Sequence, residues 1–215
     1  MKLTGIYSNR PEVGVIRGYT TPFFEEGMSR PAWFEKFCGA YACMPPHKNP
    51  EESGYKASLC GAGLSFRTEL VRLIFDSSLP FFLVGRTKDI LNRGDDSEIC
   101  FRAGLMGWKL WYEKTLHLKH IILSRRLNWD YVLRARRGFG RADIVLRLYR
   151  DLLAGNEPLT HHQLSVHICW LWEEFWQRRS QHRDIIKLKN EGDSIALRYQ
   201  YLQGFTEGYL EILVS

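Results

Sequence analysis

Three carboxylates lie within four residues near the middle of this 215-residue sequence. They are Asp95, Asp96 and Glu98, in the segment Arg-Gly-Asp-Asp-Ser-Glu-Ile-Cys-Phe-Arg that spans 93–102. Carboxylates at the start of a helix often only offset the helix dipole and accept hydrogen bonds from unpaired amides. Alternatively, one of them is held in a cleft as a general base while its neighbours bind substrate hydroxyls or a metal. The motif alone favours the first interpretation, and the surrounding segments considerably strengthen the second.

The residues after the motif predict a helix that presents these carboxylates. Asp96 or Ser97 can cap it, and Gly107 ends it. Its predicted buried stripe consists of Ile99, Ala103 and Met106.

A glycine-rich turn precedes the acidic motif. The segment 60–67 reads Cys-Gly-Ala-Gly-Leu-Ser-Phe-Arg and is followed by a predicted helix that Thr68 caps, with Leu70, Leu73 and Ile74 facing inward. Glycines spaced by one residue are a weak signal, found more often in tight turns than in ligand loops. Such a turn nevertheless leaves backbone amides open to a ligand oxygen.

A basic segment follows the motif. Seven arginines fall between Arg125 and Arg147, in a helical pattern interrupted by Gly138-Phe139-Gly140. A solvated helix face is the simpler explanation, because arginine is a good surface helix former. The functional alternative is contact with a diphosphate or with anionic lipid.

Short strands and loops must position these groups. A short apolar strand is predicted over 13–16, with its end at Gly18. An extended stretch follows to Phe24, in which Pro22 indicates an edge of the sheet or an exit from it. A helix opened by Pro31 is predicted over 31–44. Loops follow over 45–58, which could close over a ligand, and over 80–92. Two strands, 108–112 and 116–122, bring His117 or His120 to a sheet end.

The last third predicts two helices. Pro158 opens the first, with Thr160 and Gln163 as a capping box, and the second begins near Asp193. Trp170, Trp172 and Trp176 enlarge the apolar surface of the first helix, so the pair should dock on the body, a partner or a bilayer interface, with core packing favoured. Gly204 and Gly208 predict close helix packing. A metal site at His161, His162 and His167 is disfavoured, because these positions do not share a helix face well.

The composition narrows the function classes. Apolar residues make up 45% of the sequence, enough for a core, and the net charge of +6 favours anionic partners. The five cysteines have no CxxC spacing, which favours reduced packing cysteines in a cytoplasmic protein. The start of the sequence does not resemble a signal peptide, and no uncharged run approaches membrane-spanning length.

In their order along the chain, these segments resemble the second half of a family 2 glycosyltransferase, whose two-layer nucleotide-sugar-binding fold is known as GT-A. The resemblance covers roughly residues 9–150. It implies an α/β fold: a partial GT-A-like mixed sheet flanked by helices as an acceptor-side half domain over 1–150, and a helical C-terminal extension over 151–215. The motifs that carry it are 11–18 with 31–34, 60–67, 93–98, 107–112, Lys119-His120 with Arg126-Leu127, and Tyr131 with 137–140.

The resemblance implies an inverting sugar transfer in surface polysaccharide synthesis. Asp96 matches the catalytic base, and Asp95 replaces the usual glutamate beside it. The other residues assigned to substrate binding are Asp95, Glu98, Gly61, Ala62, Gly63 and Arg126. His120 matches a position that can approach the metal or the diphosphate, and Lys119 stands where family members often have a second histidine.

The same resemblance implies partners and a cofactor. The partners are a nucleotide-diphosphate sugar and a glycan acceptor, and the cofactor is a divalent ion, Mn or Mg. The Asp-any-Asp motif that holds this ion is absent from the sequence, as are the strand–helix repeats of a nucleotide-binding half. We therefore expect a truncated or split form that acts with such a half, in the cytoplasm and peripheral at the inner face of the membrane.

A second hypothesis belongs to another class. The basic helix and the Trp-rich helices could make the chain a non-catalytic module that binds an anionic membrane or a partner. Nucleic-acid binding is disfavoured, because the aromatic residues are not interleaved with the arginines on one strand face.

Overall fold

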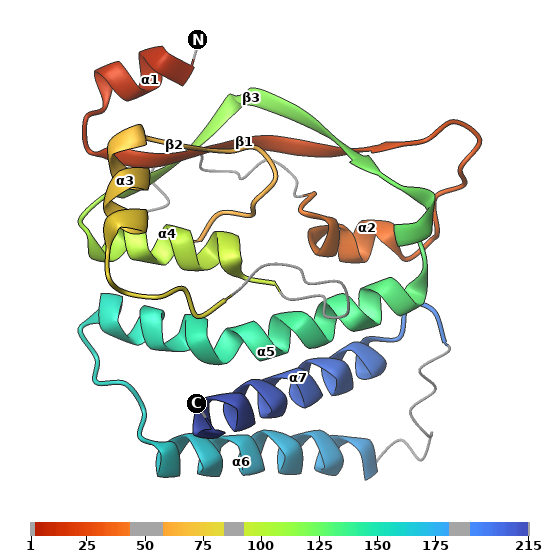
Figure 1. Ribbon diagram of the computed structural model, residues 1–215. Helices are drawn as coiled ribbons and strands as arrows, with labels where there is room; N and C mark the ends of the chain where they lie inside the picture. Colours follow the sequence, from red (N-terminus) through yellow and green to blue (C-terminus); the bar gives the residue numbers. More distant parts are fainter. Residues whose placement is uncertain (1–2, 44–57, 84–92, 181–189, 215) are drawn as a thin grey trace.

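The computed structural model describes residues 3–43, 58–83, 93–180 and 190–214, and the account below concerns these residues (Figure 1). The described chain is mixed α/β, with one three-stranded sheet and seven α-helices. In Figure 1 the sheet lies at the top, with α4 (Asp95–Leu105) and α2 (Phe34–Phe37) beneath it. The helices α5 (Trp129–Ala154), α7 (Ser194–Val214) and α6 (His161–Ser180) follow in succession below. All but residue 58 of the predicted loop over 45–58, and most of the loop over 80–92, lie outside the described residues.

The sheet has the strand order β2-β1-β3 and is mixed, as predicted. The central strand β1, Val13–Phe24, pairs antiparallel with β2, Leu64–Phe66, and parallel with β3, Lys109–Ile122. β2 covers only 15–17 of β1. Pro22 therefore lies where β1 has one described neighbour, in agreement with its predicted edge position.

The two strands predicted over 108–112 and 116–122 form a single bulged strand. Gly18 pairs with Glu113, whereas Tyr19 pairs with His117, so three residues of β3 bulge out between the two registers. A Cβ at position 18 would overlap the carbonyl oxygen of Leu116. Glycine thus allows the bulge, and both halves of β3 stay in one sheet.

The helix α4, Asp95–Leu105, begins differently from the sequence prediction. Neither Asp96 nor Ser97 caps it: Gly94 takes the N-cap position with φ +96° and no side-chain cap. A Cβ on Gly94 would lie 2.9 Å from Cβ of Ala142, so glycine is required both by its dihedral angle and by the contact with α5. The predicted buried stripe is also wrong in part, because Ala103 is buried but Met106 is 41% exposed.

Other helices differ in length from their predictions. The segment predicted as a helix over 31–44 holds only α2, Phe34–Phe37, and the 3₁₀ turn η1, Cys38–Tyr41. α3, Thr68–Asp76, starts without a side-chain cap. The remaining elements are α1 (Leu3–Asn9), η2 (Ser124–Arg126), α5 (Trp129–Ala154), α6 (His161–Ser180) and α7 (Ser194–Val214).

The helix α5 is continuous through Gly138-Phe139-Gly140, where an interruption was predicted. Gly140 serves packing between helices. A Cβ at Gly140 would overlap the carbonyl oxygen of Tyr201 in α7, and a Cβ at Gly204 would overlap that of Arg137 in α5. The predicted close packing at Gly204 and Gly208 is confirmed, and its partner is α5.

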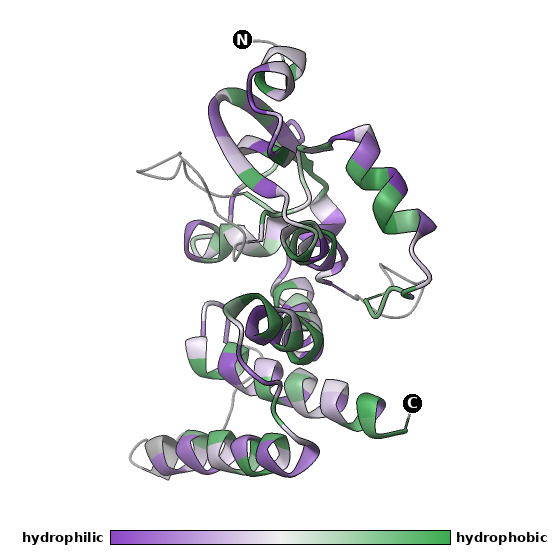
Figure 2. Cartoon of the chain, turned by 90° about the vertical axis from the view of Figure 1, so that its left-hand side faces the viewer, coloured by the Kyte–Doolittle hydropathy of each residue, from purple (hydrophilic) through white to green (hydrophobic). Residues whose placement is uncertain are grey.

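The C-terminal helices pack on the body. Ile144 of α5 shares one hydrophobic cluster with Leu164, Ile168 and Phe175 of α6 and Leu202 of α7. The capping box of α6 forms as predicted: the amide of Thr160 donates to Gln163 at 2.9 Å, and the amide of Gln163 donates to Thr160 Oγ1 at 3.3 Å. Figure 2 shows hydrophilic and hydrophobic residues alternating around α6 at the bottom of the molecule.

None of the described helices is long and apolar enough to cross a lipid bilayer.

Candidate functional site

Four separate segments surround one cavity of about 540 Å³ beneath the sheet, which we call the cleft. The segments are η1, the glycine turn, the start of α4, and the end of β3 with η2; Phe139 of α5 adds an aromatic wall. Six of the eight residues selected from the sequence line it: Asp95, Asp96, Gly61, Ala62, His120 and Arg126. Gly63 and Glu98 do not.

Asp96 faces the glycine turn from the first turn of α4. Its Oδ2 accepts a short hydrogen bond from the amide of Gly61, and its Oδ1 accepts one from the amide of Ser97 at 2.8 Å. Burial raises the pKa of Asp96 above its ordinary value of 3.8, the two amides and Arg93 oppose this shift, and Asp95 adds to it. A carboxyl group with a raised pKa beside an open cavity can accept a proton as a general base.

The glycine turn is shaped to this carboxylate. A Cβ at Gly61 would lie 3.0 Å from Oδ2 of Asp96, so any side chain there would crowd the carboxylate. Gly63 has another role: its φ of +79° closes the turn, and its nearest neighbour is Leu118. Gly63 therefore supports the turn from outside the cleft.

His120 lies in the wall that the end of β3 contributes to the cleft, and it has a defined tautomer. Its Nδ1 lies 2.7 Å from the carbonyl oxygen of Tyr41. Because a carbonyl only accepts, Nδ1 carries the proton and the neutral ring has its lone pair on Nε2. A backbone carbonyl that orients a histidine in this way is common behind metal-ligating histidines. The other histidine proposed for the sheet end, His117, instead pairs with Thr21 Oγ1 at 2.7 Å.

Two arginines of the cleft share one tyrosine. Arg93 donates to the hydroxyl of Tyr131 at 2.8 Å and to the carbonyl of Ala40 at 2.8 Å. Arg126 donates to the same hydroxyl at 2.6 Å. Tyr131 therefore holds both guanidinium groups at the cleft, where they can attract an anion.

Arg17 is a functional candidate that the sequence analysis missed. It is 1% exposed on β1, and it donates to the carbonyls of Ala42 at 3.0 Å and Ala62 at 3.4 Å and to Thr20 Oγ1 at 3.2 Å. It thus links two walls of the cleft. Its partners among the described residues are neutral, so its positive charge is not offset by a carboxylate there. An arginine in an otherwise apolar strand segment was the available signal.

The structure corrects the assignment of Glu98 to substrate binding. Glu98 is fully buried on the side of α4 away from the cleft. Its Oε1 accepts from Arg102 at 2.8 Å, from the hydroxyl of Tyr149 at 2.9 Å and from the amide of Phe82 at 3.1 Å, and its Oε2 accepts from the amide of Leu83 at 2.7 Å. This group, which we call the Glu98 cluster, joins α4, α5 and residues 79–83. Glu98 is held by protein groups and has a structural role.

Some arginines of the basic segment line cavities, and others form ion pairs on the helix surface. Arg126 lines the cleft, but Arg137 and Arg141 pair with Glu207 of α7, and Arg134 pairs with Asp130. These pairs fit the simpler explanation, a helix face made of solvated and packed arginines. Arg136 belongs to a second cavity, described below.

The described residues contain no group of three or more His, Cys, Asp or Glu side chains that could hold a metal ion. His120 fits the role of a single ligand, through Nε2, and within the described part of the chain it has no complete set of companions. Any metal at the cleft would need ligands from elsewhere.

Comparison of the chain with protein-family models, curated proteins and solved structures found no match in any of the three.

Proposed function

We propose that this chain is the acceptor-side part of an inverting, family 2-like glycosyltransferase of surface polysaccharide synthesis. The observation that supports it best is the meeting of Asp96, the Gly61 turn, His120 and Arg126 at one cleft, although these residues lie up to 65 positions apart in the sequence. The mixed sheet of β1, β2 and β3 would be the acceptor-side part of a GT-A-like sheet. This finer fold assignment rests on the family resemblance.

In the proposed reaction, Asp96 takes the proton of an acceptor hydroxyl. The hydroxyl oxygen forms a bond to the anomeric carbon of the donor sugar as the bond from that carbon to the nucleotide diphosphate breaks. Attack from the side opposite the leaving group inverts the anomeric centre. Arg93 and Arg126 lie where they can attract the negative charge of the departing diphosphate.

A divalent ion, Mn or Mg, would neutralise the diphosphate when bound. His120 is the one residue of the cleft proposed to contact it, through Nε2. The chain has no Asp-any-Asp motif, so we propose that a nucleotide-binding half supplies the other ligands and holds the base of the nucleotide. Within this chain, the chemistry is limited to proton transfer by Asp96, anion attraction by the arginines and acceptor positioning by the Gly61 turn.

The test is release of nucleoside diphosphate from a panel of nucleotide sugars, with Mn or Mg and mixed glycan acceptors, using this chain together with the nucleotide-binding half that the proposal requires. We expect Asp96→Asn to lower the rate about 10²–10⁴-fold, the usual contribution of a general base. Asp130→Asn is the matched control, because Asp130 is 72% exposed, pairs with Arg134 and does not line the cleft. Equal rates for the two variants would exclude Asp96 as the base, and no release from any donor would overturn the transferase proposal.

Exposed apolar residues on α6 favour a second candidate function, attachment to a membrane surface or a partner. Val166, Trp170 and Trp176 are 55%, 54% and 49% exposed, and helical spacing places them on one side of α6. Tryptophan favours the water–lipid boundary. Co-sedimentation with phosphatidylglycerol vesicles should weaken in Trp170→Ser but not in Leu152→Ser, which changes a 49% exposed residue of α5. Equal binding by both variants would exclude α6 as the attachment site.

A further inference from the structure

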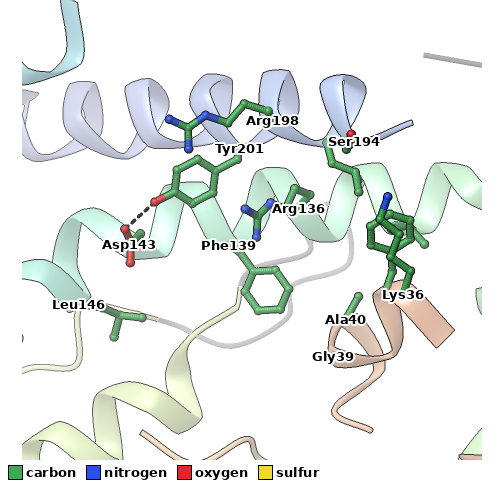
Figure 3. A pocket seen from close by; sticks show the side chains of 13 residues that line it. Lys36, Gly39, Ala40, Arg136, Phe139, Asp143, Leu146, Ser194, Arg198 and Tyr201 are labelled. Carbon is green, nitrogen blue, oxygen red and sulfur yellow. Dashed lines mark hydrogen bonds between the residues drawn. The ribbon is translucent and has the colours of Figure 1, made fainter. Parts of the chain in front are cut away.

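A second cavity of about 670 Å³ adjoins the cleft, and the proposed reaction does not use it. The two cavities share Gly39, Ala40 and Phe139, so a ligand that extends past Phe139 can reach both. The cavity lies between η1, α5 and α7 (Figure 3). Its charged residues are Lys36, Arg136, Arg198 and Asp143, and its apolar walls include Val132, Leu146 and Leu197.

The positive charges of this cavity exceed its negative charge. Lys36, Arg136 and Arg198 contribute three cations, against the single carboxylate of Asp143. That carboxylate is already engaged: its Oδ2 accepts from the hydroxyl of Tyr201 at 2.6 Å, and its Oδ1 pairs with Arg150 at 2.8 Å. We call this space the cationic cavity.

Two guanidinium groups converge on the ring of Tyr201. Arg136 lies 4.7 Å and Arg198 lies 5.9 Å from the ring centroid. Figure 3 shows the side chains of Arg136 and Arg198 beside this ring, between α5 and α7. The charge of Arg198 acts against that of Arg136, and an anion placed between them would relieve the repulsion.

The arginines are only lightly paired with carboxylates. Among the described residues, Arg136 has no ion pair, and Arg198 has a long one of 3.8 Å with Glu174. Burial lowers the pKa of Arg136, and Arg198 lowers it further, although Tyr201 and Asp143 oppose the shift. Arginine nevertheless stays charged in proteins, so the cavity keeps a partly desolvated positive charge.

The shape and chemistry fit an oxyanion carried by a sugar. A guanidinium fork matches the geometry of a carboxylate or phosphate, and apolar walls strengthen the attraction by excluding water. Aromatic walls with a few polar groups are typical of small-molecule sites. Phe139, which lies between the cavities, provides such a wall for the sugar ring.

We infer that the cationic cavity binds a carboxylate or phosphate group of the acceptor, so that the acceptor is an acidic glycan. The identification of the ligand as the acceptor rests on the proposed function, because the hydroxyl that reacts would lie at Asp96 in the adjoining cleft. Anion binding itself depends only on the cavity. A neutral glycan of the same size would leave Arg136 without an anionic counterpart among the described residues.

The test measures binding by NMR chemical-shift titration with three probes: glucuronate, glucose 6-phosphate and glucose. We expect at least one acidic probe to bind about tenfold or more tightly than glucose, with affinity that falls as salt rises. Comparison of glucuronate with glucose 6-phosphate shows whether the cavity prefers a carboxylate or a phosphate. Arg136→Gln should abolish the preference, and Arg134→Gln should keep it, because Arg134 lies on the same helix but is 57% exposed and paired with Asp130.

The outcomes separate the inference from the proposed function. Equal binding of glucose and both acidic probes, or an unchanged preference in Arg136→Gln, would overturn the inference whatever the enzymatic result. Asp96→Asn should keep the acidic preference while it loses sugar transfer. Preferred binding without any transfer would leave the anion site standing and remove the proposed function.

Discussion

Asp96 and Glu98 are two residues apart on α4 and lie on opposite sides of it. Asp96 lines the cleft, whereas Glu98 is fully buried in the Glu98 cluster. Two residues along a helix correspond to a turn of about 200°, so the acidic motif must divide between two faces. Of the three carboxylates, only Asp95 and Asp96 are in position to contact a substrate.

The Glu98 cluster and the cleft also differ in the partners of their buried arginine. In the Glu98 cluster, Arg102 is 3% exposed and pairs with Glu98 at 2.8 Å. Behind the cleft lining, Arg17 is 1% exposed, and its described partners are neutral oxygens, including the carbonyls of the cleft residues Ala42 and Ala62. A compensated pair stabilises the fold, while a positive charge whose described partners are all neutral can attract anions toward the cleft. Glu98, which pairs with a buried arginine, is therefore the structural carboxylate of this helical turn.

Glu98→Ala gives the largest expected effect and tests the structural side of the comparison. It leaves Arg102 charged and buried and removes the acceptor of two backbone amides. Removal of one partner of a buried pair costs about 3–5 kcal/mol of unfolding free energy. Denaturant unfolding measures the loss, and Glu98→Gln, which keeps the shape and loses the charge, serves if the alanine variant does not fold.

Asp95→Ala is the matched control for Glu98→Ala. Asp95 belongs to the same turn of α4 but is exposed, so its removal should change the unfolding free energy by about 0.5 kcal/mol or less. Equal losses in Asp95→Ala and Glu98→Ala would mean that the Glu98 cluster does not stabilise the fold, and the comparison would fail.

A pair of tyrosines gives a smaller effect and sharpens the comparison. Tyr149 donates to Glu98 and accepts from Arg102 at 3.1 Å, and it is 5% exposed. Tyr131 accepts from Arg93 and Arg126, whose guanidinium groups lie at the open cleft. We expect Tyr149→Phe to cost about 1–3 kcal/mol, because buried charged partners lose a hydrogen bond. Tyr131 is equally buried, at 4% exposed, but Arg93 and Arg126 line the cleft, where water can hydrate their guanidinium groups. Tyr131→Phe should therefore cost less.

Unfolding of the two phenylalanine variants under the same conditions measures this difference. A larger stability loss in Tyr131→Phe than in Tyr149→Phe would show that the cleft arginines are held as firmly as the Glu98 cluster. Tyr131→Phe should still weaken the binding of inorganic pyrophosphate, because it releases Arg93 and Arg126 from their shared partner.

Local patterns in the sequence predicted much of this arrangement. The spacing of Thr160 and Gln163 predicted the capping box, and Gly204 and Gly208 predicted close packing. Family resemblance selected Asp96, Gly61 and His120 together, and the structure places all three at one cavity. Such features depend on neighbouring residues or on an ordered set of motifs, both of which a sequence displays directly.

Features that depend on distant contacts could not be predicted. The helix α5 is continuous through Gly140, where α7 packs closely against it, and that contact joins residues more than 60 positions apart. Arg17 gains its importance from Ala42 and Ala62, which lie on other segments. The role of Glu98 was accessible in part, because helical periodicity alone separates it from Asp96.

The smallest expected effect is the pH dependence of stability that Asp96 contributes. It tests the assignment of Asp96 to the cleft and of Glu98 to structure at a single group. Because its pKa is raised by burial, the folded state binds a proton more tightly than the unfolded state. The stability from this group is therefore complete below the ordinary value of 3.8 and is lost as pH rises through the raised pKa. The unfolding free energy of the wild type minus that of Asp96→Asn should fall over this range, by about 1.4 kcal/mol for each pH unit that separates the pKa of the folded state from that of the unfolded state.

The same difference for Asp130→Asn supplies the background, and a carbon NMR titration of the Asp96 carboxyl gives the midpoint directly. If that midpoint lies at or below 3.8, the amides of Gly61 and Ser97 outweigh burial, and Asp96 is a satisfied helix-terminal carboxylate like the many that serve structure alone.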